Sequence, residues 1–192
     1  MTEKKLFMVL LGCKPQGRNT EQHDIFFGIG DSLRDMVPQI EAFWKDAGKI
    51  HIDCWREVTT VDGYSITIKS RTTPIPPSSS TDEKLFFINL GGYKENDFEE
   101  YHYKMLRIAR EKGKAIQDAM QTAFYKHMSF KGAESHIDDK YGVDVDDIYE
   151  IQDILSPELK EQYKICVEKG TGNIMEDELH PGYTKISDLV TR

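Results

Sequence analysis

The sequence Leu-Phe-Met-Val-Leu-Leu-Gly at residues 6–12 returns 79 residues later as Leu-Phe-Phe-Ile-Asn-Leu-Gly at residues 85–91. The first copy is a short, continuous apolar run that ends in glycine, and such a run is typical of a β-strand buried on both faces. The alignment continues without a gap as far as residue 29 and gives seven identities in 24 positions. Because this agreement exceeds chance and the motifs keep their order, we interpret the chain as two similar units in tandem.

A second block of the alignment follows after insertions in the second unit. Residues 51–66 align with residues 136–151 and share seven identities in 16 positions. This alignment places His51-Ile52-Asp53 on His136-Ile137-Asp138. On a strand, the isoleucine between two polar residues points to the opposite face. We therefore predict that Ile52 and Ile137 are buried and that each histidine lies near the aspartate that follows it.

Each unit is predicted to contain two strands, a helix and two further strands. In the first unit the strands are expected at residues 6–11, 23–29, 50–58 and 64–69, and Asp62-Gly63 is typical of a tight hairpin turn. The helix is expected after Ser32, where Pro38 interrupts an apolar stripe and should kink or restart it. The predicted fold class is therefore α+β: a tandem duplication of a ββαββ unit with mostly antiparallel sheet, plus a short C-terminal helix and strand.

Four segments are predicted along the chain. Residues 1–70 form the first repeat, 71–83 a linker rich in proline and serine, 84–155 the second repeat, and 156–192 a C-terminal helix, strand and tail. Ser156-Pro157 is typical of a helix start, because serine caps the helix and proline suits its first position. The tail from residue 170 is punctuated by glycine, proline and acidic residues and is expected to lie on the surface.

Composition limits the classes of partner and the location. The chain has 25 Lys plus Arg against 33 Asp plus Glu, a net charge of −8, which argues against nucleic acid and against an anionic membrane surface. No apolar run approaches the ~20 residues that a spanning helix needs. The three cysteines fit neither a disulfide framework nor a zinc site. Free thiols and the absence of a signal-like start predict a cytoplasmic protein.

The candidate site residues are polar pairs that recur in both copies. They are Glu21 with His23, His51 with Asp53, Glu100 with His102, and His136 with Asp138. Two residues apart on a strand, the members of a pair share one face. A carboxylate beside an imidazole can orient it, raise its basicity, or join it in binding a metal or a ligand. The alternative interpretation is structural: cross-strand polar contacts that satisfy half-buried histidines.

Other motifs carry no site. The sequence contains no HExxH or CxxC pattern, so no metal ligand set is predicted from spacing alone. Residues 138–147 are rich in aspartate, and within them Asp144-x-Asp146 matches the first two ligand positions of a calcium loop. Ile148 stands at the third ligand position, so we interpret the segment as a solvated acidic turn. Cys13 follows a strand and a glycine, yet Gly92 holds its place in the second copy, which favours an inert thiol.

Several of these segments resemble a known family. They are residues 6–17, 21–30, 51–53, 122–127 and 136–147. They are similar to the bacterial domain of unknown function 1543 family over roughly residues 6–155. The resemblance implies an uncharacterised bacterial protein with a duplicated domain. It implies no activity, cofactor or catalytic residue.

Two classes of function follow from the sequence. The first is a non-enzymatic binding or interaction protein, with a homodimer formed through strand edges as one arrangement. The second is a small metal-binding protein or enzyme that uses the duplicated Glu-x-His and His-x-Asp pairs. The sequence identifies neither the cofactor nor the small-molecule or protein partner. Convergence of the pairs in space would favour the second class.

Overall fold

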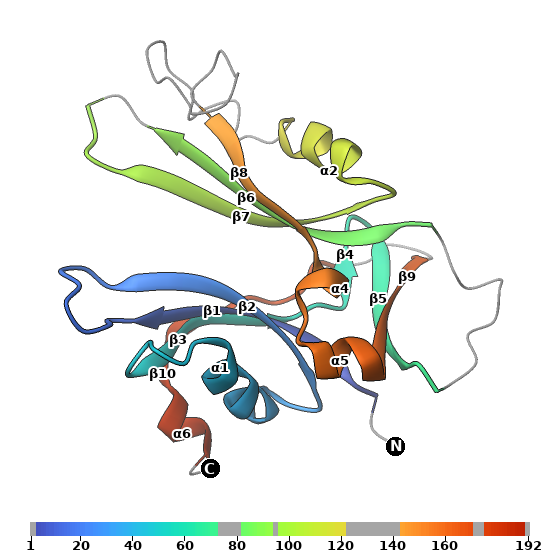
Figure 1. Ribbon diagram of the computed structural model, residues 1–192. Helices are drawn as coiled ribbons and strands as arrows, with labels where there is room; N and C mark the ends of the chain where they lie inside the picture. Colours follow the sequence, from blue (N-terminus) through green and yellow to red (C-terminus); the bar gives the residue numbers. More distant parts are fainter. Residues whose placement is uncertain (1–2, 73–81, 94–95, 122–142, 171–174, 191–192) are drawn as a thin grey trace. The chain divides into compact units, whose positions relative to one another are not determined.

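A computed structural model describes residues 3–72, 82–93, 96–121, 143–170 and 175–190 (Figure 1). The predicted fold class is confirmed as mixed α+β, with antiparallel sheets and short helices. The chain divides into two compact units. The first consists of Met1–Ser80 together with Leu155–Arg192, and the second of Thr81–Ile154.

The first unit contains two antiparallel sheets, with strand orders β10-β3-β1-β2 and β4-β5-β9. Its strands are β1 (Lys5–Cys13), β2 (Gln22–Gly30), β3 (Ile50–Glu57), β4 (Thr60–Val61), β5 (Tyr64–Ser70), β9 (Tyr163–Lys169) and β10 (His180–Lys185). Its helices are η1 (Leu33–Met36), α1 (Val37–Phe43), α5 (Pro157–Gln162) and α6 (Ile186–Val190). The capped helix predicted at Ser156-Pro157 is confirmed as α5, and the strand that follows it as β9.

Alternation along β1 builds the core of the first unit. Phe7, Val9 and Leu11 point to one face of the sheet and pack there with Ile52 of β3. Ile52 is fully buried, as predicted from its place between two polar residues. The helical segment covers the same face. It starts as the 3₁₀ turn η1 and restarts as α1 at Pro38, where the missing N–H costs nothing in the first turn.

The Asp62-Gly63 turn forms, but between different strands from those expected. Both residues have positive φ, 51° and 78°, and the turn joins the two-residue strand β4 to β5. The expected pairing of residues 50–58 with 64–69 is wrong, because β3 stays beside β1 and β5 pairs with β9. Bonding of β5 to β9 satisfies its backbone groups in a separate sheet.

The C-terminal tail is more structured than predicted. Strand β10 pairs with β3, with a register shift between Pro181 and Thr184. An edge strand tolerates the proline, and Gly182 adopts a φ of 143° within the irregular stretch. The ring of His180 stacks on Trp55 at 4.0 Å. None of residues 180–190 is buried, in agreement with a surface location, but they form a strand and a helix.

The described residues of the second unit form an antiparallel sheet with the order β7-β6-β8. Its elements are β6 (Lys84–Tyr93), β7 (Glu100–Ala109), α2 (Lys112–Ala119), β8 (Val143–Glu150) and α4 (Ile151–Ile154). Phe86, Ile88 and Leu90 of β6 form its core with residues of β7 and α2. The sequence predicts the helix of this unit from an apolar stripe at Ala115, Ile116, Ala119, Met120, Ala123 and Phe124. Helix α2 covers the first part of this stripe, and residues 122–124 lie outside the described residues.

Strand β8 takes the position beside β6 that β3 takes beside β1. Leu11 pairs with Ile52 and Leu90 with Val145, and both ladders shift register just before these residues of the central strands. The residue skipped at this bulge is Asp53 in β3 and Asp146 in β8.

Residues 143–150 therefore form the third strand of the second unit, and two expectations are wrong. These residues are not the counterpart of residues 58–65, and they are not part of an acidic turn. The backbone pairing with β6 shows that these residues form a strand. Their composition is compatible with this, since Val143, Val145 and Ile148 suit a strand although acidic residues lie between them. His136-Ile137-Asp138 lies outside the described residues.

Other contacts recur at corresponding places in the two units. The Lys5 ammonium lies 2.8 Å from Glu57, and the Lys84 ammonium lies 2.7 Å from Glu150. A short sequence pattern also recurs. Strand β5, which comes after β3 in the chain, and strand β9, which comes after β8, each begin with tyrosine, any residue and isoleucine. The units thus share a helix, a three-strand order, a bulge and an ion pair.

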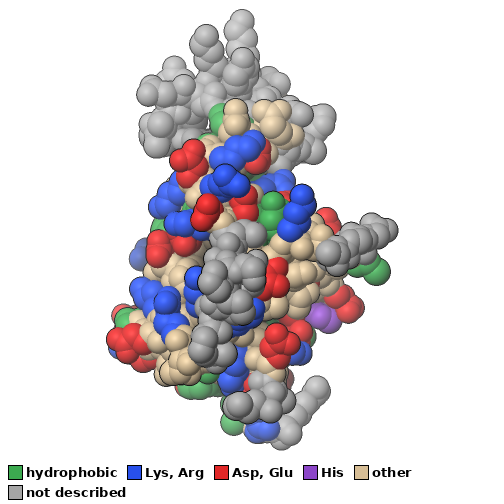
Figure 2. All heavy atoms as spheres, turned by 90° about the vertical axis from the view of Figure 1, so that its right-hand side faces the viewer, with side chains coloured by type: hydrophobic (Ala, Val, Ile, Leu, Met, Phe, Trp, Pro, Cys, Tyr) green, Lys and Arg blue, Asp and Glu red, His purple; other side chains and the backbone are tan. Residues whose placement is uncertain are grey.

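Charged side chains of both signs lie on the surface of the molecule. Figure 2 shows acidic and basic side chains interspersed over the face that it draws, with apolar side chains scattered among them. Among the described residues, no helix is both long enough and apolar enough to cross a membrane.

Candidate functional site

The sequence-predicted pairs of the first unit converge on one face of its four-stranded sheet. His23 of β2 and His51 of β3 are the register partners of Gly12 on the central strand β1. Glu21 comes just before β2, and Asp53 is the bulge residue of β3. The face is opposite to the core, since Ile52 between His51 and Asp53 is buried.

The four groups form a closed ring in which each carboxylate reaches both imidazoles. His51 Nε2 lies 3.2 Å from Glu21 Oε1 and 3.2 Å from Asp53 Oδ1. His23 Nε2 lies 3.2 Å from Asp53 Oδ2 and 3.8 Å from Glu21 Oε2. His51 is buried, whereas Glu21 and His23 remain exposed. The predicted proximity of His51 to Asp53 is confirmed.

Gly12 makes room for this ring. A Cβ at this position would lie 2.4 Å from His51 Nε2 and 2.7 Å from Asp53 Oδ2, closer than such atoms can approach. The glycine that ends the apolar run of β1 therefore leaves the space that the two side chains of β3 occupy. The second unit has the same feature, because a Cβ at Gly91 would lie 2.4 Å from Asp146 Oδ2.

We expect Gly12→Ala to displace the ring and to lower the free energy of unfolding by about 1–3 kcal/mol, the usual cost of overpacking. Urea unfolding followed by circular dichroism measures this loss. Gly113→Ala is the control, since nothing lies within 4 Å of a Cβ there and alanine is the better helix former. Equal stability of Gly12→Ala and the unmodified chain would contradict the close packing around Gly12.

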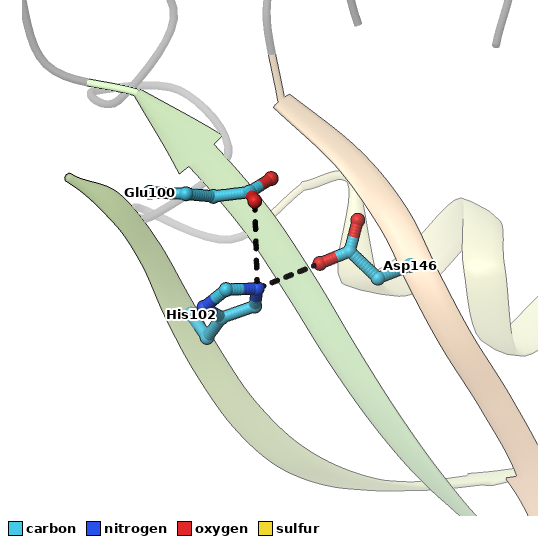
Figure 3. Close-up of side chains that lie close together, drawn as sticks. All are labelled: Glu100, His102 and Asp146. Carbon is cyan, nitrogen blue, oxygen red and sulfur yellow. Dashed lines mark ion pairs between the residues drawn. The ribbon is translucent and has the colours of Figure 1, made fainter. Parts of the chain in front are cut away.

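The second unit has a more compact cluster, Glu100, His102 and Asp146, drawn in Figure 3. His102 Nε2 lies 3.3 Å from Asp146 Oδ2 and 3.9 Å from Glu100 Oε2. One donor atom from each side chain can be chosen so that all three lie within 4.8 Å of one another. The pKa of the Tyr93 hydroxyl is raised by desolvation and by Glu100, to which it hydrogen-bonds.

Sequence reasoning found two of these three residues and missed Asp146. The alignment had matched Asp53 to Asp138, which lies outside the described residues together with His136. One feature of the sequence could have indicated Asp146. It precedes Glu150, the last residue of β8, by the same number of residues as Asp53 precedes Glu57, the last residue of β3. The register position of His51 is held in the second unit by Asp144.

Among the described residues, Glu100, His102 and Asp146 bring three possible cation ligands close together. Protonated imidazoles would pair with the carboxylates, and neutral imidazoles could bind a metal through Nε2. Two donors that bind one cation at about 2.0–2.2 Å lie at most about 4.4 Å apart. The separations of 3.3 and 3.9 Å around His102 fall within this limit.

The cysteines take no part in either cluster. Burial raises the pKa of the Cys13 thiol above its ordinary value, and the nearby Glu21 carboxylate adds to the rise. A buried, protonated thiol is a poor nucleophile, so the structure agrees with an inert Cys13. Cys54 and Cys166 are also free thiols.

Comparison with known proteins finds a family model that matches a segment of the chain and a solved structure with a similar fold. Residues 18–68 match the model of the Domain of Unknown Function (DUF1543). The crystal structure of a protein Il1583 from Idiomarina loihiensis is similar at a TM-score of 0.58 and 20% identity, covering 96% of this chain and 98% of that chain. No curated protein matches the chain. At this identity the similarity to the solved structure concerns the fold.

Proposed function

We propose that this protein is a non-enzymatic binding protein of two similar units, related by duplication, and that it binds a divalent transition-metal cation. The site is the cluster of Glu100, His102 and Asp146 in the second unit. The observation that carries the proposal is the approach of these three donor groups within 4.8 Å of one another. Manganese(II) and zinc(II) both accept a mixture of imidazole and carboxylate ligands.

The surroundings of the three groups support this function. Glu100 and His102 come from β7 and Asp146 from β8, the two strands that flank β6. Because Gly91 on β6 has no side chain, the Asp146 carboxylate can lie against this strand. The Tyr93 hydroxyl holds Glu100, and such outer hydrogen bonds orient metal ligands. Side-chain exposures of 38% for Glu100 and His102 leave the remaining coordination positions to water.

Binding is proposed because the three described groups of the cluster are side chains that can serve as ligands of a cation. The charge of −8 favours the attraction of cations over that of nucleic acid. Three free thiols fit the reducing conditions of the cytoplasm, where we place the protein.

The first test is titration of the chelator-treated full-length chain with manganese(II) by calorimetry. We expect binding at the second unit, and we expect Asp146→Asn to weaken it by about 10–100-fold because a charged ligand is lost. Asp118→Asn is the matched control. It removes one carboxylate from the same unit, where Asp118 pairs with Lys114 on α2. Equal affinity of the two variants, or no binding to the unmodified chain, would overturn the proposal.

A further inference from the structure

The first unit holds a second cluster of different composition. We infer that Glu21, His23, His51 and Asp53 form a cation site of their own that prefers zinc(II) over manganese(II). This inference deepens the proposed function but uses only residues of the first unit. It names a separate site and the class of cation that the site selects.

The preference for zinc follows from the number of imidazoles. The first unit offers two imidazoles and two carboxylates, which makes four ligands, the number that zinc usually takes. The cluster of the second unit offers one imidazole, since Asp144 holds the register position of His51. Imidazole favours zinc, nickel and copper, whereas carboxylates and water suit manganese and magnesium.

Three observations indicate that the first-unit cluster is built to hold something. His51 is 6% exposed although its ring nitrogen faces two carboxylates. Asp53 Oδ2 is buried and accepts no well-aligned hydrogen bond from a described residue, and the His23 ring nitrogen lies 3.2 Å from it. Gly12 has no side chain, so His51 and Asp53 can fill the place that a Cβ would take. A buried carboxylate oxygen without a well-aligned donor costs free energy, and a bound cation would lower this cost.

Strand β10 gives the first-unit site a cover. The ring of Tyr183 lies 4.4 Å from the ring of His51, at an interplanar angle of 32°. This contact fixes the plane of the imidazole and excludes water from one of its faces. Restricting the imidazole in this way reduces the entropy lost when a cation binds.

The present arrangement is a ring, so binding requires a small movement. Each carboxylate now bridges the two histidines, with contacts of 3.2–3.8 Å. Glu21 and His23 are each 44% exposed and can change rotamer toward a cation held by His51 and Asp53. The buried half of the cluster thus supplies the fixed ligands and the exposed half the adjustable ones.

Calorimetric titration of the chelator-treated full-length chain with zinc(II) and with manganese(II) tests the inference. We expect zinc to bind the first unit at least about 10-fold more tightly than manganese does. His51→Gln should weaken zinc binding at this site by about 100-fold or more, while manganese binding that depends on Asp146 persists. His23→Gln, a change at an exposed position, should also weaken zinc binding and keeps the test valid if His51→Gln does not fold.

His180→Gln is the control variant, because His180 stacks on Trp55 in the same unit and is not part of the ring. We expect it to bind zinc as the unmodified chain does. Zinc binding that is unchanged in both His51→Gln and His23→Gln overturns the inference. A failure of the proposed function appears separately, as manganese binding that does not respond to Asp146→Asn.

Discussion

Ile52→Ala should lower the free energy of unfolding by about 2–5 kcal/mol, a range typical for truncation of a fully buried aliphatic side chain. Ile52 is 0% exposed and packs in the first core with Phe7, Val9 and Leu11. The variant loses the transfer free energy of three carbons and leaves a cavity beneath the central strand. Urea unfolding followed by intrinsic fluorescence and circular dichroism measures the loss.

The matched control is Ile154→Ala, which makes the same chemical change at a side chain that is 39% exposed. We expect a much smaller loss there, because part of that surface is already in water. Equal losses in the two variants would contradict the placement of Ile52 in the core. They would also contradict the assignment of His51 and Asp53 to the opposite face, since that assignment depends on the same alternation.

Local patterns predict much of the first unit because each acts over few residues. The apolar run at residues 6–11 is long enough for a central strand, and the Ser156-Pro157 pair is typical of the first positions of a helix. The position of Pro38 at the start of α1 follows from its missing N–H in the same way. These elements need no information about distant parts of the chain.

Pairing between distant strands could not be predicted in this way. The alignment of residues 51–66 with residues 136–151 has more identities than that of β3 with β8, yet the ladders show that β8 is the third strand. Register depends on which backbone groups pair and which side chains face the core, and identity reports neither. Alternation of valine and aspartate at residues 143–146 was the better signal.

The sequence predicted the candidate site residues that repeat at β2 and β7. Its prediction was incomplete for the residue that comes from β8. Glu21, His23, Glu100 and His102 were found because their spacing survives in a gapless alignment. Asp146 was missed because its role follows from the bulge in β8, which only the pairing with β6 defines. The cover that Tyr183 gives to His51 comes from β10, far along the chain, and no local pattern indicates it.

A chain shortened to end at Glu178 should lose about 3–5 kcal/mol of the stability of its first unit, because it lacks β10 and α6. Ile186 and Leu189 pack against the first core, and full burial of such a side chain stabilises a fold by about 1.5–3 kcal/mol. The stack of His180 on Trp55 adds about 0.5–1.5 kcal/mol. The Arg34 side chain also loses the carbonyl of Val190 as an acceptor. Urea unfolding measures the change.

The same shortened chain tests whether β10 protects the edge of β3. Without β10, the outer backbone groups of β3 have no partner, and an unpaired edge strand recruits other strands. We therefore expect concentration-dependent association in size-exclusion chromatography, which a chain ending at Val190 should not show. Asp177 stays in the shortened chain and still accepts hydrogen bonds from Thr59, so the loss belongs to β10 and α6 alone. An unchanged unfolding midpoint without association would mean that β3 needs no cover, and Tyr183 would then have no part in holding His51.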